Sequence, residues 1–244
     1  MTDTAQQPLP ETVVAQLRAT STATISTQLY QRGLRNVFLQ GPRRVQTPGE
    51  RMVGEAFTMR CIPAREDLDP LSVYQDYDHP QRVGVESVQP GQVLVIDARG
   101  RRDTASLGFI LATRLQVRGA AGIVTDGAIR DSDDFPGLTM PVFANGSSPV
   151  TNLRVHHVLE NQVPIGCGEV PVYPGDVIVG DEDGVVCIPR HLAEEVARDG
   201  YAQERLEEFI LGKVATGSPL RGTYPASPEV LAEYRDTEGD TTTH

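Results

Sequence analysis

The feature that most constrains the fold is an apolar run in the middle of the chain, Gln92–Asp97 (QVLVID), which follows the turn residues Pro90-Gly91. A continuous apolar run of this length predicts a strand buried on both faces. Residues 107–117 (LGFILATRLQV) then show apolar positions at helical spacing, and residues 121–125 (AGIVT) form a second short apolar run. Strand, helix and strand in such close succession predict a right-handed βαβ unit with parallel strands.

The regions on either side of this unit have different patterns. Residues 10–34 show helical spacing, and residues 52–62 predict a strand that ends at a proline. Residues 65–82 are polar and acidic, which is typical of a solvated surface segment and also permits a lid. Short extended segments separated by Gly, Pro and Asp occur over residues 149–189, and we expect a layer of mostly antiparallel strands there.

Residues 191–214 again show helical spacing, with Gly200 as a potential kink, and the tail from residue 217 carries three prolines. We expect this tail to fray or to pack across a neighbour. The overall prediction is a single α/β domain over residues 1–244. It has a central βαβ unit, an N-terminal helical segment at 10–34, and a C-terminal helix and tail at 191–244.

Charge and cysteine content exclude several classes of protein. The chain carries 22 Lys and Arg residues against 33 Asp and Glu residues, a formal net charge of -11. This balance argues against a protein that binds nucleic acid by itself, because such proteins usually present a basic face. No apolar stretch is long enough to cross a bilayer, and the N-terminus does not resemble a secretory signal. Three widely spaced cysteines without a CxxC motif fit reduced thiols, so we expect a cytoplasmic location.

Charged residues follow both strands of the predicted βαβ unit. Asp97 follows the first strand, and Asp126 follows the second, a few residues before Arg130-Asp131. Because ligands of α/β sheets bind beyond the carboxyl ends of parallel strands, we expect a guanidinium beside two carboxylates at this edge. Arginine suits a planar carboxylate or a developing enolate, and Asp131 suits a hard cation such as Mg²⁺. An ordinary exposed Arg–Asp ion pair after a strand is the simpler interpretation of the same residues.

Residues 90–189 resemble the RraA-like family. This family includes 4-hydroxy-4-methyl-2-oxoglutarate and 4-carboxy-4-hydroxy-2-oxoadipate aldolases, and regulators that bind and inhibit ribonuclease E. The resemblance implies a swivelling β/β/α sandwich that assembles as a homotrimer or hexamer with sites between subunits. The residues that carry the likeness are GAAGIVTDGAIRD (119–131), PVFA (141–144), VPI (163–165) and PGDVIVGDEDGVV (174–186).

The resemblance also implies roles for particular residues. In the family's aldolases an Arg holds the 2-oxo acid and stabilises the pyruvate enolate, and the Asp after it binds a divalent metal such as Mg²⁺. Arg130 and Asp131 match this pair, but counting back past twenty residues puts Phe109 where the aldolases have a further acid. A phenyl ring accepts no hydrogen bond from a metal-bound water, and loss of such a partner costs about 10–100-fold in affinity or activity. The metal is therefore in doubt.

These observations leave three functions open. The first is a lyase that cleaves or decarboxylates a small 2-oxo acid with metal at Asp131, Arg130 on the enolate, and Asp126 or a metal-bound water moving the proton. The substrate would also be bound by residues of the segment Leu107, Gly108, Phe109 and Ile110, whose backbone N–H groups open the helix. The second is the same scaffold with a repurposed, metal-independent pocket. The third is a non-catalytic regulator that binds a ribonuclease.

Three further sequence features have structural interpretations. His156 and His157 are adjacent, so on a strand they point to opposite faces and do not form a pair of metal ligands. Asp181, Glu182 and Asp183 precede Gly184 between two apolar segments, which predicts a hairpin turn. Cys167 lies between two glycines without an evident base, so we expect a small buried side chain rather than a reactive thiol.

Overall fold

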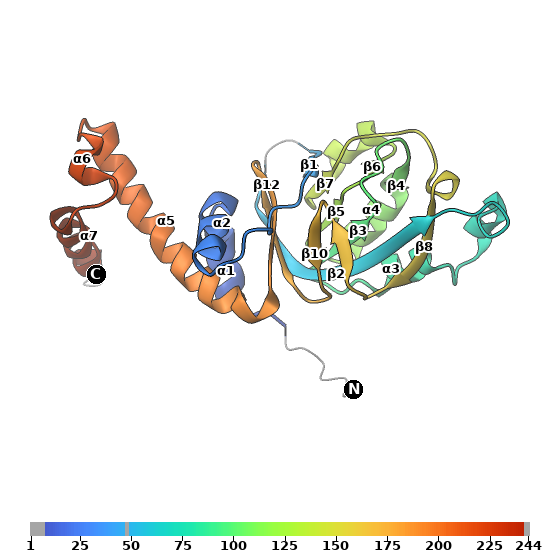
Figure 1. Cartoon of the computed structure of the whole chain (residues 1–244), viewed down its shortest axis with the longest axis horizontal. Helices are drawn as coiled ribbons and strands as arrows, with labels where there is room; N and C mark the ends of the chain where they lie inside the picture. The colour runs from blue at the N-terminus through green and yellow to red at the C-terminus, as the bar shows by residue number, and fades with distance from the viewer. Residues whose placement is uncertain (1–7, 47–48, 242–244) are drawn as a thin grey trace.

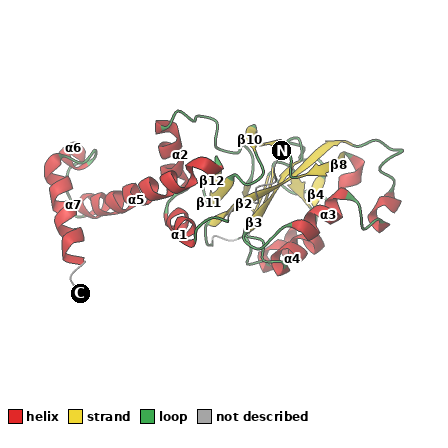
Figure 2. Cartoon of the chain, turned by 90° about the horizontal axis from the view of Figure 1, so that it is seen from below, coloured by secondary structure: helices red, strands yellow, loops and turns green. Residues whose placement is uncertain are grey.

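The computed structural model describes residues 8–46 and 49–241. It consists of a body built around one large sheet and a helical arm that extends from one end of the body (Figure 1). The first part of the long helix of this arm lies beside the N-terminal helices, and its far end carries the last helices of the chain (Figures 1 and 2).

The predicted α/β class with a central βαβ unit is confirmed. Strands β2 (Met52–Pro63), β3 (Gln92–Asp97), β5 (Gly122–Thr125) and β7 (Val142–Ala144) are adjacent and parallel in the sheet. The full order is β1-β7-β5-β3-β2-β11-β12, and β8 pairs with the far part of β2. The carboxyl ends of the parallel strands therefore meet at one edge of the sheet, where the polar segments after β3 and β5 lie.

The antiparallel strands predicted for the second half of the chain form, but most of them join this same sheet. They are β8 (His156–Asn161), β11 (Val177–Asp181) and β12 (Gly184–Ile188), and β1 (Arg43–Arg44) pairs with β7 at the opposite edge. These strands belong to the central sheet because β2 has 12 residues and pairs with β11 near its start and with β8 near its end. Only β9 (Ile165–Cys167) and β10 (Val170–Val172) form a separate hairpin in this region of the described chain.

Alternating side chains of the central strands fill two cores. Leu94 and Ile96 of β3 pack with residues of α3 (Pro80–Ser87) and α4 (Phe109–Val117), which lie on one side of the sheet (Figure 2). Val93 and Val95 point to the other face, which the β9–β10 hairpin covers. A third core joins the β11–β12 end of the sheet to α1 (Glu11–Ala19), α2 (Thr22–Gln31) and the start of α5 (Ala193–Ala215).

The helix predicted over residues 107–117 begins two residues late. Residues 105–107 form β4 (Ala105–Leu107), which pairs in parallel with β6 (Ala128–Ile129), and Gly108 is the N-cap of α4. The hydroxyl of Ser106 lies 2.9 Å from that of Thr125 and 3.1 Å from the carbonyl oxygen of Ala128. These contacts fix residues 105–107 as an extended segment, and no local pattern in the sequence indicates such a distant partner.

The C-terminal part also differs from the prediction. Helix α5 runs through Gly200 without interruption, and a Cβ at this buried position would come 3.1 Å from Thr20 Cγ2, so the glycine permits close helix packing. The tail contains α6 (Leu220–Thr223) and α7 (Pro228–Thr241), so it does not simply fray. Short 3-10 helices occur at η1 (Leu71–Gln75), η2 (Ser132–Gly137), η3 (Asn152–Arg154) and η4 (Arg190–Leu192). Within the described ranges, none of the helices has both the length and the apolar character needed to cross a bilayer.

Candidate functional site

A cavity of about 210 Å³ lies where β4 and β6 meet the first turn of α4. Its wall combines these elements with η1, the start of α3 and the η3 turn. The lining residues are Tyr74, Gln81, Arg82, Ala105, Leu107, Gly108, Ile110, Leu111, Arg130, Asp131, Thr151 and Asn152.

Arg130 and Asp131 lie at the end of β6 and are held loosely. The backbone N–H of Arg130 donates to the carbonyl of Leu107, which fixes the main chain. The side chains form an ion pair of 3.5 Å between Nε and Oδ2, and they are 42% and 41% exposed. No other side-chain hydrogen bond holds the Arg130 guanidinium among the described residues, so its remaining N–H groups are available to a ligand.

The N-cap of α4 approaches this pair closely. A Cβ on Gly108 would lie 2.7 Å from Asp131 Oδ2 and 2.9 Å from Arg130 Nε, closer than real Cβ atoms come. The φ of Gly108 is -120°, which any residue adopts, so the glycine is required by this approach and not by its backbone conformation. The backbone N–H of Phe109 donates to Asp131 Oδ2 at 3.2 Å, which ties the carboxylate to the start of the helix.

The polar segment before α3 forms a wall that the sequence did not assign. Tyr74 lies in η1, and its hydroxyl donates to Asn152 Oδ1 at 2.6 Å and contacts the Thr151 hydroxyl. The guanidinium of Arg82 lies over the Tyr74 ring at 5.7 Å from its centroid. Of the two readings of residues 65–82, this placement favours a wall over the cavity rather than a fully solvated excursion.

Asn152 contributes an unsatisfied donor to the same cavity. It is 6% exposed, and its Nδ2 has no hydrogen-bond partner among the residues that the structure describes. A buried donor without a partner costs about 1–3 kcal/mol unless a bound group satisfies it. A ligand oxygen in the cavity would do so.

Of the residues predicted to bind substrate, Leu107, Gly108, Ile110 and Arg130 line this cavity. Phe109 does not, because its ring packs edge-on against Phe135 with ring centroids 5.7 Å apart. The predicted N–H cradle is also incomplete. The Phe109 N–H is occupied by Asp131, and Leu107 lies in a strand instead of a helical turn.

Asp126 lies outside the cavity, which corrects the expectation of two carboxylates beside Arg130. It is 4% exposed and accepts backbone N–H groups of Ala98, Gly100 and Gly168 at 2.7, 3.0 and 3.3 Å. Burial raises the pKa of this carboxyl, and the backbone donors act in the opposite direction. A carboxylate so fully bonded to backbone holds three loops together and is poorly placed to move a proton.

The lining residues fit an anion better than a resident metal ion. Two arginines, Arg82 and Arg130, line the cavity together with one carboxylate, Asp131. Among the described lining residues, the one buried side-chain atom without a partner is Asn152 Nδ2, which is a hydrogen-bond donor, whereas Mg²⁺ needs oxygen acceptors. Within the described residues no three His, Cys, Asp or Glu side chains are grouped as metal ligands. We therefore derive no step through a metal.

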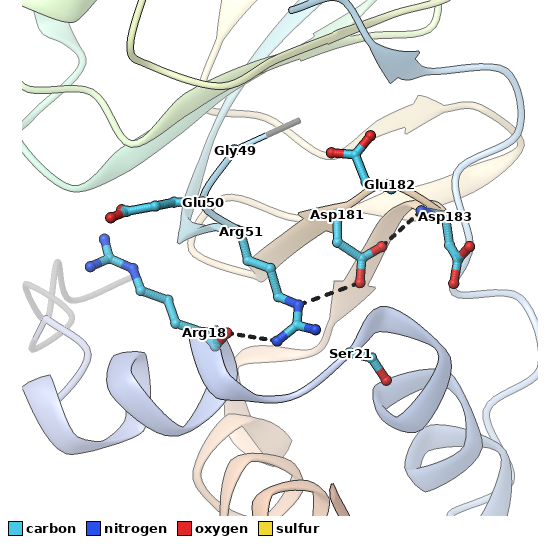
Figure 3. Close-up of a pocket in the computed structure, with 8 residues that line it drawn as sticks. All are labelled: Arg18, Ser21, Gly49, Glu50, Arg51, Asp181, Glu182 and Asp183. Atoms are coloured by element: carbon cyan, nitrogen blue, oxygen red, sulfur yellow. Dashed lines mark hydrogen bonds and ion pairs between the residues drawn. The ribbon is translucent and has the colours of Figure 1, made fainter. Parts of the chain in front are cut away.

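A larger hollow, of about 640 Å³, lies between α1, the start of β2 and the β11–β12 turn (Figure 3). Two of its charged side chains, Asp181 and Arg51, already make structural contacts. Asp181 accepts hydrogen bonds from the backbone N–H and hydroxyl of Thr22 at 2.8 and 2.7 Å and pairs with Arg51 at 3.6 Å. Arg51 also donates to the carbonyl of Arg18. These bonds connect the predicted hairpin turn, which the register Asp181↔Gly184 confirms, to the N-terminal helices.

The other singled-out residues are structural. His156 is fully buried, while His157 on the other face has its Nδ1 2.8 Å from Asp69 Oδ1, as expected for adjacent strand residues. The three cysteines are free and buried, and burial raises the pKa of the Cys61 thiol to about 12. Cys167 is likewise buried, and burial raises the pKa of its thiol, which fits a packing role.

Comparison with known proteins gives a consistent result. The chain is 32% identical to RraAS2 of Streptomyces coelicolor, described as an unusual member of the RNase ES inhibitor RraA protein family. The TM-score is 0.74, over 84% of this chain and 98% of that one. An uncharacterised protein of Pseudomonas syringae matches at 28% identity and a TM-score of 0.77, over 90% of this chain and 100% of that one.

A Halalkalibacterium halodurans protein, provisionally named 4-hydroxy-4-methyl-2-oxoglutarate aldolase, is 39% identical over 49% of this chain. The match spans 56% of that protein's own length. The model of the RraA-like family, described as Aldolase/RraA, matches residues 22–187. This range includes the large sheet up to β12 and every residue that lines the cavity at Arg130. The chain therefore belongs to the RraA-like family.

Proposed function

We propose that the cavity at Arg130 binds a small 2-oxo acid and cleaves one of its carbon–carbon bonds through a pyruvate enolate. The observation that carries this proposal is the pair of guanidinium groups and the unsatisfied Asn152 amide around one small cavity. The provisional name of the relative from H. halodurans supports a lyase of this kind.

In this scheme Arg130 does the chemical work. Cleavage leaves two electrons on the former carbonyl oxygen, and a positioned guanidinium stabilises that charge as it develops. Arg82 and the Asn152 amide bind carboxylate oxygens through charge-assisted or neutral hydrogen bonds. Asp131 is the one carboxylate in the described lining, so it is the candidate to take the hydroxyl proton in a retro-aldol reaction. Decarboxylation needs no such base, because CO₂ leaves without the bonding electron pair. That pair passes into the enolate, which water then protonates at carbon to give pyruvate.

The test is pyruvate release from oxaloacetate and from 4-hydroxy-4-methyl-2-oxoglutarate, measured with and without a chelator and against protein-free controls. We expect release that Arg130→Ala lowers by about 10²–10³-fold, the usual cost of losing an oxyanion donor. Arg114→Ala is the matched control, because this exposed arginine on α4 pairs with Glu86 away from the cavity. Release that survives Arg130→Ala would contradict the proposal. Release that disappears with chelator would contradict the metal-independent scheme.

A second candidate function follows from the likeness to RraAS2, which is described as belonging to a family of ribonuclease inhibitors. In that case the chain would bind a ribonuclease, and neither 2-oxo acid would be cleaved. Inhibition of a purified RNase E-type enzyme that is unaffected by Arg130→Ala would favour this candidate. Assembly as a homotrimer or hexamer and a cytoplasmic location stay predictions, and sedimentation would test the first.

A further inference from the structure

A second cavity, of about 370 Å³, lies on the other side of the segment that carries Arg130 and Asp131. It is formed by β1, the loop after β7, the segment before β4 and the end of β6. The lining residues are Gly41, Arg43, Arg44, Val45, Arg102, Ile129, Ser132, Ala144, Asn145, Gly146 and Ser147. Three of these are arginines and none is acidic, in a chain whose formal net charge is -11.

Two of the three guanidinium groups are not neutralised. Arg44 pairs with Glu182 at 2.6 Å, but neither Arg43 nor Arg102 has a carboxylate partner among the described residues. Arg43 donates to the carbonyl of Pro42 at 3.2 Å, and Arg102 donates from Nε to the carbonyl of Asn145 at 2.8 Å. A carbonyl orients a guanidinium without cancelling its charge, and the other N–H groups of each fork stay available.

Neutral donors lie around these two charges. The hydroxyl groups of Ser132 and Ser147 make no hydrogen bond to another described residue. Gly146 has a φ of +121°, so the loop after β7 turns sharply at the point where Arg102 approaches it within 3.7 Å of a Cβ position. Val45 and Ala144 supply a small apolar floor. Positive charge, free hydroxyls and the absence of lining acids together describe a receptor for an anion.

We infer that this cavity is a binding site for a small, multiply charged anion that carries phosphate or carboxylate groups. A guanidinium group binds either a phosphate or a carboxylate through two parallel N–H hydrogen bonds. Because the cavity holds two such guanidinium groups, a ligand with at least two negative charges matches it best. The inference does not depend on the proposed lyase function, because none of the residues it uses lines the first cavity.

The position suggests a consequence for the first site. Ile129 and Ser132 line the anion cavity, while Arg130 and Asp131, between them in the chain, line the other. An anion bound in this cavity would contact Ile129 and Ser132, the chain neighbours of Arg130 and Asp131. Binding would therefore shift the backbone that positions the Arg130 guanidinium. If the lyase function is present, we expect the bound anion to change the KM for the 2-oxo acid.

Isothermal titration with inorganic pyrophosphate and with citrate tests the site and distinguishes the two sources of charge. We expect the full chain to bind at least one of them, with a Kd that rises with salt. The double variant Arg43→Gln/Arg102→Gln should bind at least tenfold more weakly. The matched control is Arg35→Gln/Arg101→Gln, which removes the same charge. Arg35, like Arg43, lies over an aromatic ring, and Arg101 pairs with Asp103 beside Arg102.

A second variant keeps the test independent of arginine loss. Ser147→Asp places a carboxylate at an exposed lining position, and it should weaken anion binding about as much while thermal unfolding stays unchanged. No binding by the unmodified chain would overturn the inference, as would equal loss in both double variants. Binding abolished by Arg130→Ala instead would place the anion in the first cavity. A change in sedimentation of Arg43→Gln/Arg102→Gln without a change in anion binding would assign the cavity to contact with a second copy, which also overturns it.

Discussion

Asp126 and Asp131 lie on one short segment after β5, yet their surroundings are opposite. Asp126 is 4% exposed and accepts three backbone N–H groups, two from the loop after β3 and one from the β9–β10 turn. The Asp131 side chain is 41% exposed and contacts only the Phe109 N–H and the Arg130 guanidinium among the described residues. The first carboxylate is saturated and holds the scaffold. The second, with Arg130, keeps bonding capacity for a ligand.

The largest expected effect is on folding stability. Asp126→Ala leaves the N–H groups of Ala98, Gly100 and Gly168 without this acceptor, and Ala98 and Gly168 are buried. At about 1–3 kcal/mol for each buried group, the free energy of unfolding should fall by at least about 2 kcal/mol. Asp131→Ala removes a half-exposed ion pair and should cost less than about 1 kcal/mol. Urea unfolding at neutral pH measures both. Equal losses in the two variants would remove the distinction between scaffold and site.

The affinity for Mg²⁺ tests whether Asp131, unlike Asp126, is free to bind a ligand. Phe109→Asp adds a second carboxylate next to Asp131 at the start of α4, and it should raise Mg²⁺ affinity by about 10–100-fold, together with metal-dependent lyase activity. Phe109→Asn is the control, because it loses the same ring contact with Phe135 without adding charge. Calorimetric titration with Mg²⁺ separates the two. No gain for Phe109→Asp over Phe109→Asn would count against the assignment of Asp131 to the site.

A smaller effect is expected from Gly108→Ala. The new Cβ would collide with Asp131 Oδ2 and Arg130 Nε, while the backbone conformation suits alanine. This contact would displace the Arg130 and Asp131 side chains. Pyruvate release should then be about tenfold slower, because misplaced groups lose much of their catalytic effect. Gly137→Ala in η2, where a Cβ meets nothing within 4 Å, is the control. A Gly108→Ala variant with full activity would show that the close approach is incidental.

The smallest effect is on pH dependence. Burial raises the pKa of Asp126, so the folded chain holds this proton to a higher pH than the unfolded chain. Its ionisation therefore lowers the free energy of unfolding as pH rises from about 4 through the folded pKa. The stability of the unmodified chain relative to Asp126→Asn should rise as pH falls towards about 4, by about 1.4 kcal/mol for each unit of pKa shift. A difference that does not vary with pH would contradict this ionisation.

Sequence patterns predicted the parts of the molecule that local chemistry determines. The apolar runs of β3 and β5, the helical spacing of α4 and the Asp-rich turn before Gly184 each specify their own structure. The pairing of β4 with β6, and the approach of Tyr74 and Arg82 to the cavity, depend on residues far apart in the chain, so no local pattern indicated them.

The site was predicted in part for the same reason. Arg130 and Asp131 were proposed as site residues from their position after a strand and from the family resemblance, and the structure places both in the cavity wall. Asp126 shares that position, and only the packed loops show that backbone N–H groups surround it. The Phe109 ring packs against Phe135 and does not enter the cavity. No local sequence pattern indicates this orientation, because the two rings are far apart in the chain.

The central claim is that the Arg130 guanidinium is available to an anionic ligand while Asp126 is not part of the site. The most direct measurement is the affinity for oxalate, a planar dianion that resembles the pyruvate enolate. Titrations would compare the unmodified chain with Arg130→Ala and Asp126→Asn at a temperature where all three are folded. The account predicts that Arg130→Ala weakens oxalate binding at least tenfold, which corresponds to the loss of one charge-assisted hydrogen bond. It predicts that Asp126→Asn changes the affinity by no more than about twofold. Oxalate binding that depends on Asp126 and not on Arg130 would contradict it.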